Sequence, residues 1–183
     1  IIKKSLLNPP FAKLYKKNII NDLRFDESVR IGEDLLFNLE YIKKCKNIIF
    51  IPMALYNYKI NLNSAMHTFL ENSFNEKLFV YENLKKFIIE NNVCSINIIE
   101  KNIIEDYEWY LQNLYYSNSK KEYRKNVFYK TINISKLNYA IFNLKYNNIL
   151  NKLFFFIIKR KKFELVEIYF KTKKTIKHFR YIN

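Results

Sequence analysis

The stretch that decides the fold is "VRIGEDLLFNLEYIKKCKNIIFIPMALYNYKI", residues 29–60, in which a helical pattern gives way to a strand-like one. Apolar residues recur at three- and four-residue spacing between Leu35 and Ile42, which predicts a helix from Glu33 to about Lys44. The segments "NIIFIP" and "ALYNYKI" are rich in β-branched and aromatic residues and are separated by a proline. They predict two short strands.

Helical patterns dominate the rest of the chain. A short helix is expected over residues 11–22, and a basic, aromatic stretch runs from about 149 to 181. Four further segments carry apolar residues at helical spacing, near 70–91, 96–117, 120–131 and 136–146. We therefore expect an α+β fold that is predominantly α-helical. The best single boundary lies near residues 65–70, which gives one domain at 1–69 and a helical extension at 70–183.

Composition excludes several classes of protein. Hydrophobic residues make up 49% of the 183 residues and aromatic residues 17%, so the chain can build a core and intrinsic disorder is not the default expectation. The longest apolar run, "LFFFII" at 153–158, is too short to span a bilayer. Cys45 and Cys94 stand far apart with no metal-ligand spacing, and we expect reduced thiols in a cytoplasmic protein.

The positive charge is concentrated at the C-terminal end. Residues 1–119 contain 15 Lys/Arg and 14 Asp/Glu, whereas residues 120–183 contain 17 Lys/Arg and 3 Asp/Glu. In residues 150–183 the clusters "KRKK" and "KTKK" flank the apolar stretch "FELVEIYF". A basic amphipathic helix of this kind can bind an anionic membrane surface. The alternative is a terminal helix that packs on its own domain with its lysines in water.

The pair Glu33-Asp34 follows Gly32, the only glycine in the chain. Acidic residues in the first helical turn interact favourably with the helix dipole, which accounts for the pair without any function. The same position also suits a general base, because a helix start is rigid and can face a cleft. We expect the helix dipole to lower the pKa of such a carboxylate.

The flanking residues favour the functional interpretation. "PPFAKLY", an "RF" pair, "GEDLLFNLEY", "IIFIP" and "ALYNYKINLNSAMHTF" follow one another across residues 9–69. This order resembles the C-terminal half of bacterial family 2 glycosyltransferase domains, which build capsule, lipooligosaccharide and similar surface glycans. The resemblance implies the remnant of a GT-A-type catalytic domain, with a few helices and two short strands. It covers about a third of the chain.

The resemblance also implies roles for individual residues. Asp34 matches the general base of an inverting transfer from a nucleotide-sugar to an acceptor hydroxyl, and Glu33 its catalytic neighbour. Lys13 matches the lysine of a Pro-Trp-Asn-Lys-like segment and is expected to bind substrate. Three loop residues, Asn63, Ser64 and His67, are expected near the donor diphosphate. For His67, an ordinary surface or hydrogen-bonded histidine is an equally open interpretation.

Two departures from the family pattern limit what this chain can do alone. The expected Trp-Asn is Phe11-Ala12, and the sequence contains no Asp-x-Asp. The full-length enzyme would use Mn²⁺ or Mg²⁺ with its nucleotide-sugar, whereas we expect no metal site in these residues. The chain starts at Ile1 rather than Met, and we expect it to be an inactive part of a longer enzyme.

Partners and location follow from the same observations. We expect a nucleotide-sugar donor and a glycan or lipid-linked acceptor for the full-length enzyme, at the inner face of the cytoplasmic membrane. Peripheral membrane contact would run through residues 150–183. The competing interpretation is a basic helical module, without catalytic role, that binds an anionic membrane, nucleic acid or a protein. Nucleic acid is the weaker alternative, because no helix-turn-helix, zinc-finger or RNP-like segment is present.

Overall fold

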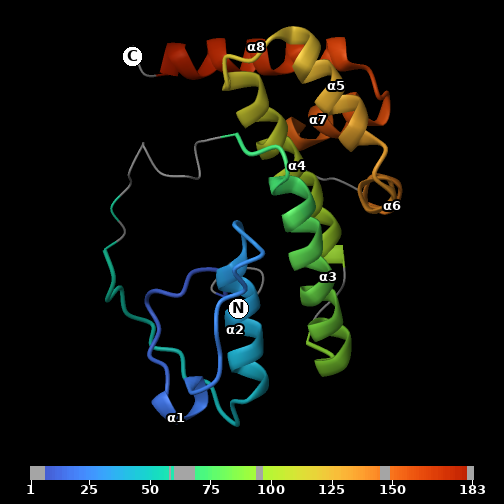
Figure 1. Ribbon diagram of the computed structural model, residues 1–183. Coiled ribbons are helices and arrows are strands. Elements are labelled where there is room, and N and C mark those ends of the chain that lie inside the picture. Colours follow the sequence, from blue (N-terminus) through green and yellow to red (C-terminus); the bar gives the residue numbers. More distant parts are fainter. Residues whose placement is uncertain (1–6, 58, 60–68, 94–96, 145–148, 181–183) are drawn as a thin grey trace. The chain divides into compact units, whose positions relative to one another are not determined.

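The computed structural model describes residues 7–57, 59, 69–93, 97–144 and 149–180 (Figure 1). Over these residues the predominantly helical class is confirmed, and the helices are α1 (Lys17–Ile20), α2 (Glu33–Lys43), α3 (Ser73–Asn91), α4 (Asn97–Tyr116), α5 (Lys121–Ile132), α6 (Ser135–Asn143), α7 (Ile149–Lys159) and α8 (Phe163–Arg180). The predicted segments at 33–44, 70–91, 96–117, 120–131 and 136–146 are each helical to within a few residues.

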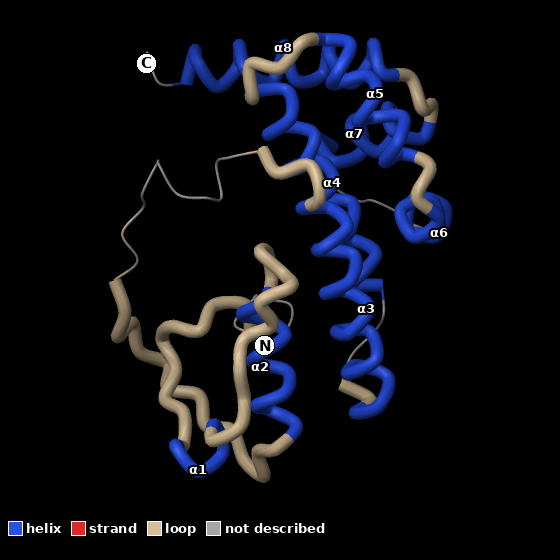
Figure 2. Tube along the Cα trace, in the orientation of Figure 1, coloured by secondary structure: helices blue, strands red, loops and turns tan. Residues whose placement is uncertain are grey.

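The two predicted strands were wrong. No strand occurs in the described part of the chain, as Figure 2 shows, and residues 45–57 are loop and turn. With no sheet among these residues, the expected GT-A-type remnant is not seen either. The physical reason is that strand preference reflects packing against neighbouring strands. Here the apolar side chains from Ile48 to Tyr56 face solvent, with Ile49 86% exposed.

The helix predicted over residues 11–22 is also much shorter than expected. Only Lys17–Ile20 is helical, and Ala12 adopts a left-handed backbone conformation with φ of 56°. The reason is that a side chain and a backbone N–H group of this segment bond to α2 instead. The Tyr15 hydroxyl donates to the Asn38 Oδ1 atom of α2 at 2.6 Å, and the Lys16 N–H donates to the Tyr41 hydroxyl at 2.7 Å. These bonds hold residues 15 and 16 in an extended path beside α2.

The chain divides into two compact units, each with its own core. The first unit comprises residues 1–65 and 75–99, and the second comprises residues 66–74 and 100–183. The predicted boundary between 69 and 70 is not tested by this division and stays a prediction. In the first unit, α2 and the main part of α3 supply most of the buried apolar side chains, among them Leu35, Leu39, Val80, Leu84 and Ile88.

The second unit is entirely helical over its described residues, apart from the turns that join its helices. Its core is built by α4 to α8, with α8 packed on both α5 and α7. The largest fully buried side chains include Tyr107, Tyr110, Phe128, Phe154 and Phe170. The loop before α3 is tied to this unit through Glu71, whose carboxylate accepts hydrogen bonds from Tyr123 and Lys130.

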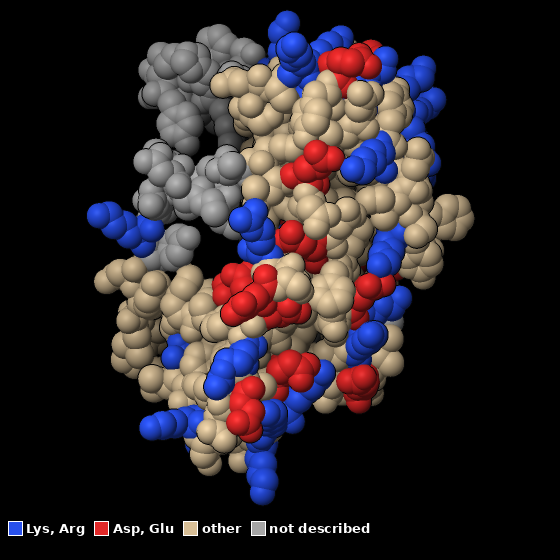
Figure 3. Space-filling model, in the orientation of Figure 1, with Lys and Arg blue, Asp and Glu red and all other residues tan. Residues whose placement is uncertain are grey.

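The basic C-terminal stretch forms two helices rather than one. α7 and α8 are separated by a turn at residues 160–162, in which Lys161 has φ of 50°. Phe163, Val166, Tyr169 and Phe170 are buried, so the apolar stretch of α8 packs on its own unit. Figure 3 shows Lys and Arg side chains around the part of this unit that contains α5 and the α7–α8 turn. Among the helices of the described residues, none is both long and apolar enough to cross a membrane.

Candidate active site

The candidate site lies at the N-terminus of α2, where Gly32 starts the helix. Gly32 has φ of 97°, a left-handed conformation that a residue with a side chain rarely adopts. Its carbonyl accepts hydrogen bonds from the Leu35 and Leu36 N–H groups at 3.1 and 3.2 Å. Glu33 and Asp34 then occupy the first turn, each partly buried. The position predicted for both carboxylates, the first turn of this helix, is confirmed.

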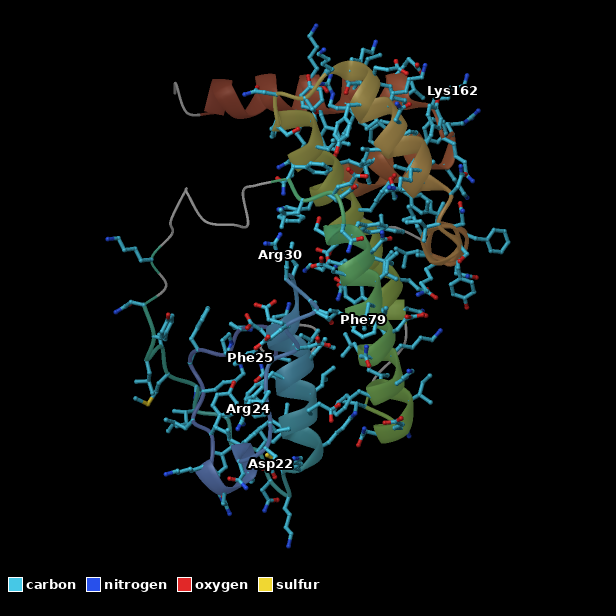
Figure 4. The ribbon with its side chains drawn as sticks, in the orientation of Figure 1. Asp22, Arg24, Phe25, Arg30, Phe79 and Lys162 are labelled. Atoms are coloured by element: carbon cyan, nitrogen blue, oxygen red, sulfur yellow. The ribbon has the colours of Figure 1, made fainter. Side chains whose placement is uncertain are left out.

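The loop that leads into α2 is held by a carboxylate of α3. The Glu76 Oε2 atom accepts hydrogen bonds from the backbone N–H groups of Arg30 and Ile31, at 3.0 and 3.2 Å. Phe25, earlier in the same loop, stacks on Phe37 of α2 with ring centroids 4.4 Å apart. Both Phe25 and Arg30 are labelled in Figure 4. These contacts fix the backbone from which Glu33 and Asp34 project.

Asn38 anchors the segment that carries Lys13 to α2. Only 1% of Asn38 is exposed, and its Nδ2 group donates to the carbonyls of Leu7 and Pro9. Its Oδ1 atom accepts the hydrogen bond from Tyr15. Asn38 and Asp34 are four residues apart, so they share one face of the helix. The amide thus brings residues 7–15 onto the face that also carries Asp34.

Lys13 is placed near Asp34 by this anchor. The Lys13 ammonium donates a hydrogen bond to the Pro9 carbonyl. Partial burial lowers the pKa of Lys13, and the negative charge of Asp34 acts in the opposite direction. The structure therefore brings together two predicted site residues that are far apart in the sequence. It also gives Asp34 a nearby positive charge.

The pKa of Asp34 is raised above its ordinary value, and the predicted lowering was wrong. Burial is the main cause, and the negative charge of Glu33 adds to it, whereas Lys13 opposes both. Desolvation disfavours the charged form of a carboxyl group, and here it outweighs the favourable position at the helix start. A carboxylate with a raised pKa is a stronger base.

Tyr15 is a site residue that the sequence did not reveal. The apolar pattern of residues 11–22 placed the Tyr15 ring on the buried side of a predicted helix. The spacing of the apolar residues indicated no role for the Tyr15 hydroxyl. Burial raises the pKa of Tyr15 to about 12, and the charge of Asp34 contributes to the rise. The phenol therefore stays protonated at neutral pH and donates to Asn38. No periodicity signal could have found it, because its partner lies on another element.

The remaining predicted site residues cannot be placed. Asn63, Ser64 and His67 lie outside the described residues. Across the residues that are described, no group of three or more His, Cys, Asp or Glu side chains is arranged to hold a metal ion. The charge of Lys13 acts on Asp34.

No protein-family model, curated protein or solved structure matches this chain.

Proposed function

We propose that the chain is the acceptor-side part of an inverting glycosyltransferase in which Asp34 is the general base. The observation that carries the proposal is that Asn38 holds the segment of Lys13 on the helix face of Asp34, so that these two residues, which the resemblance named separately, act on each other's pKa. A partly buried carboxylate with a raised pKa and a nearby cation is a typical arrangement at a functional site.

The reaction would proceed by direct displacement. The Asp34 carboxylate accepts the proton of an acceptor hydroxyl while the hydroxyl oxygen attacks the anomeric carbon of the donor sugar. The bond from that carbon to the diphosphate oxygen breaks, its electron pair leaves with the nucleoside diphosphate, and the anomeric configuration is inverted. Glu33 keeps Asp34 basic through its negative charge. Lys13 opposes that effect and favours the ionised form of Asp34.

The donor site would be supplied by a part of the enzyme outside these residues. Supporting this view, the segment from Ile48 to Tyr56 exposes several large apolar side chains in succession. Contiguous exposed apolar surface of this kind marks a contact with another protein part. The complete enzyme would act in the cytoplasm, at the inner face of the membrane, where lipid-linked acceptors of surface glycans are available.

An experiment on nucleotide binding tests whether the donor site lies outside these residues. The 183-residue chain alone should neither bind a nucleoside diphosphate in the presence of Mn²⁺ or Mg²⁺ nor hydrolyse a nucleotide-sugar, whereas the complete enzyme should do both. Isothermal titration calorimetry and a diphosphate-release assay measure the two activities. Reading the coding sequence upstream of Ile1 provides a second check, since an open frame that contains Asp-x-Asp is expected. Tight nucleotide binding by the isolated chain would contradict the proposal.

The pH dependence of turnover provides a test of the charges around Asp34. Turnover should rise with pH as Asp34 loses its proton. Glu33→Gln removes a charge that raises the pKa of Asp34, so the rise should move to lower pH. Lys13→Met removes a charge that lowers this pKa, so the rise should move to higher pH. Profiles of kcat against pH for the complete enzyme check both directions, and a shift of both variants in the same direction would exclude Asp34 as the titrating group.

A further inference from the structure

The second unit contains a long stretch without any acidic residue. Residues 123–163 carry ten Lys/Arg and no Asp or Glu. They cover nearly all of α5 and the whole of α6 and α7. Among the described residues of this stretch, Arg124 pairs with Glu167 at 2.7 Å and Lys130 pairs with Glu71 at 3.0 Å, and both carboxylates come from outside the stretch. The surface built by these helices is therefore strongly positive.

The outer face of α7 combines this charge with exposed apolar side chains. Phe154, Ile157 and Ile158 point into the core of the unit. Leu153 and Phe156, three residues apart, lie at the edge of this buried side and are each 52% exposed. Because residues three apart are neighbours on a helix surface, these two side chains form one apolar patch.

Cations surround this patch. Lys152 is exposed next to Leu153, and the Arg160 guanidinium lies over the Phe156 ring, 4.8 Å from its centroid. The exposed turn residues Lys161 and Lys162 follow. Lys162 projects away from the unit at this turn (Figure 4). We call these residues, Lys152, Leu153, Phe156, Lys159, Arg160, Lys161 and Lys162, the α7 surface.

We propose that the α7 surface binds the face of an anionic lipid membrane. Leu153 and Phe156 would enter the boundary between headgroups and acyl chains, while the cations contact the lipid phosphates. The α8 stretch "FELVEIYF", which the sequence favoured for this role, supplies most of its large apolar side chains to the core instead. The proposal does not depend on the transferase activity, since none of its residues belongs to the candidate active site.

The side chains favour lipid over nucleic acid as the partner. Nucleic-acid surfaces pair cations with aromatic rings on which bases stack. Leu153 has no ring on which a base could stack, yet about half of its surface is exposed to solvent beside Phe156. An aliphatic and an aromatic side chain flanked by lysine and arginine are typical of a helix that lies in a membrane interface.

Sedimentation of the full 183-residue chain with vesicles tests the proposal. The chain should bind vesicles of phosphatidylcholine with phosphatidylglycerol and should bind pure phosphatidylcholine vesicles much less. Leu153→Ser combined with Phe156→Ser should weaken binding to the anionic vesicles by roughly tenfold or more. Arg160→Gln combined with Lys162→Gln should weaken it on the order of twentyfold, since each cation near the surface contributes about fivefold.

Matched control variants distinguish binding through the α7 surface from nonspecific adsorption to vesicles. Ile168→Ser removes an apolar side chain of similar exposure, 59%, from α8. Lys16→Gln with Lys17→Gln removes the same charge from the first unit. Both should change binding less than about twofold, and circular dichroism should confirm that all variants are folded. Loss of binding in the controls, full binding by the Leu153/Phe156 variant, or retention of the chain by duplex DNA but not by vesicles at physiological salt would each overturn the proposal.

Discussion

Asp34→Asn in the complete enzyme is expected to lower kcat by about 10²- to 10⁴-fold, the contribution typical of a general base. The substitution keeps the size and shape of the side chain but leaves an amide that cannot accept the acceptor's proton. Donor binding should change little, because the proposed donor site lies in another part of the enzyme. Sugar transfer and nucleotide affinity, measured on the same preparation, separate these two effects.

The stability of the variant gives a second readout for the same residue. Because burial raises the pKa of Asp34, the folded chain binds its proton more tightly than the unfolded chain does. Folding is then disfavoured as pH rises through the raised pKa. At neutral pH the uncharged amide of the Asp34→Asn variant should leave the fold unchanged or slightly more stable. Loss of turnover in a destabilised protein would therefore not count as support.

Asp26→Asn is a matched control for this experiment. Asp26 lies on the surface in the loop before α2, and its carboxylate accepts hydrogen bonds from the N–H and hydroxyl groups of Ser28. These bonds lower its pKa, the opposite of the effect at Asp34. The variant should retain turnover close to that of the unmodified enzyme. Near-normal turnover of Asp34→Asn would refute the assignment of the base, and an equal loss in both variants would point to a general defect.

The helices could be predicted from the sequence because their signal is local. In α2, the spacing from Leu35 to Ile42 sets both the existence of the helix and the side it buries. Gly32 and the acidic pair mark its start, and the predicted and observed beginnings coincide at Glu33. The same logic located α3 to α6. Patterns at helical spacing succeed because each turn contacts residues that are close in sequence.

The extended segments could not be predicted, because their conformation depends on distant partners. "NIIFIP" has the composition of a strand, but no neighbouring strand is present among the described residues. Composition alone cannot supply one. The segment 11–22 shows the opposite case, since bonds to Asn38 and Tyr41 override its helical pattern. In both places a tertiary contact, or its absence, decides the backbone.

The candidate site was predictable in part for the same reason. Glu33 and Asp34 could be found from their position at a helix start, and Lys13 only through a resemblance. Tyr15 and Asn38 shape the site through a hydrogen bond between residues that are 23 positions apart in the sequence. The direction of the pKa shift of Asp34 also depends on burial. Burial is a property of the packed unit, and the helix position alone led to the wrong sign.

Gly32→Ala is expected to destabilise the first unit by about 2–4 kcal/mol, from backbone strain together with a steric clash. Gly32 has φ of 97°, which costs an alanine energy whatever its surroundings. A Cβ atom at this position would also lie 2.9 Å from the Val80 Cγ2 atom of α3. Val80 is buried and β-branched in a helix, so its side chain cannot turn away easily.

A double-mutant cycle with Val80→Ala separates the clash from the strain. Val80→Ala alone leaves a cavity and costs stability. In the double variant the new methyl group at position 32 fills part of that cavity, so the loss should be smaller than the sum of the two single losses. Urea denaturation, followed by hydrogen exchange at the α2 amide groups, measures each variant within the first unit. Strict additivity would show that the methyl group meets no resistance from Val80, and the remaining loss would then belong to the backbone of Gly32 alone. Because Glu33 and Asp34 directly follow this residue, the complete enzyme carrying Gly32→Ala should also lose turnover, in proportion to the displacement of the helix start.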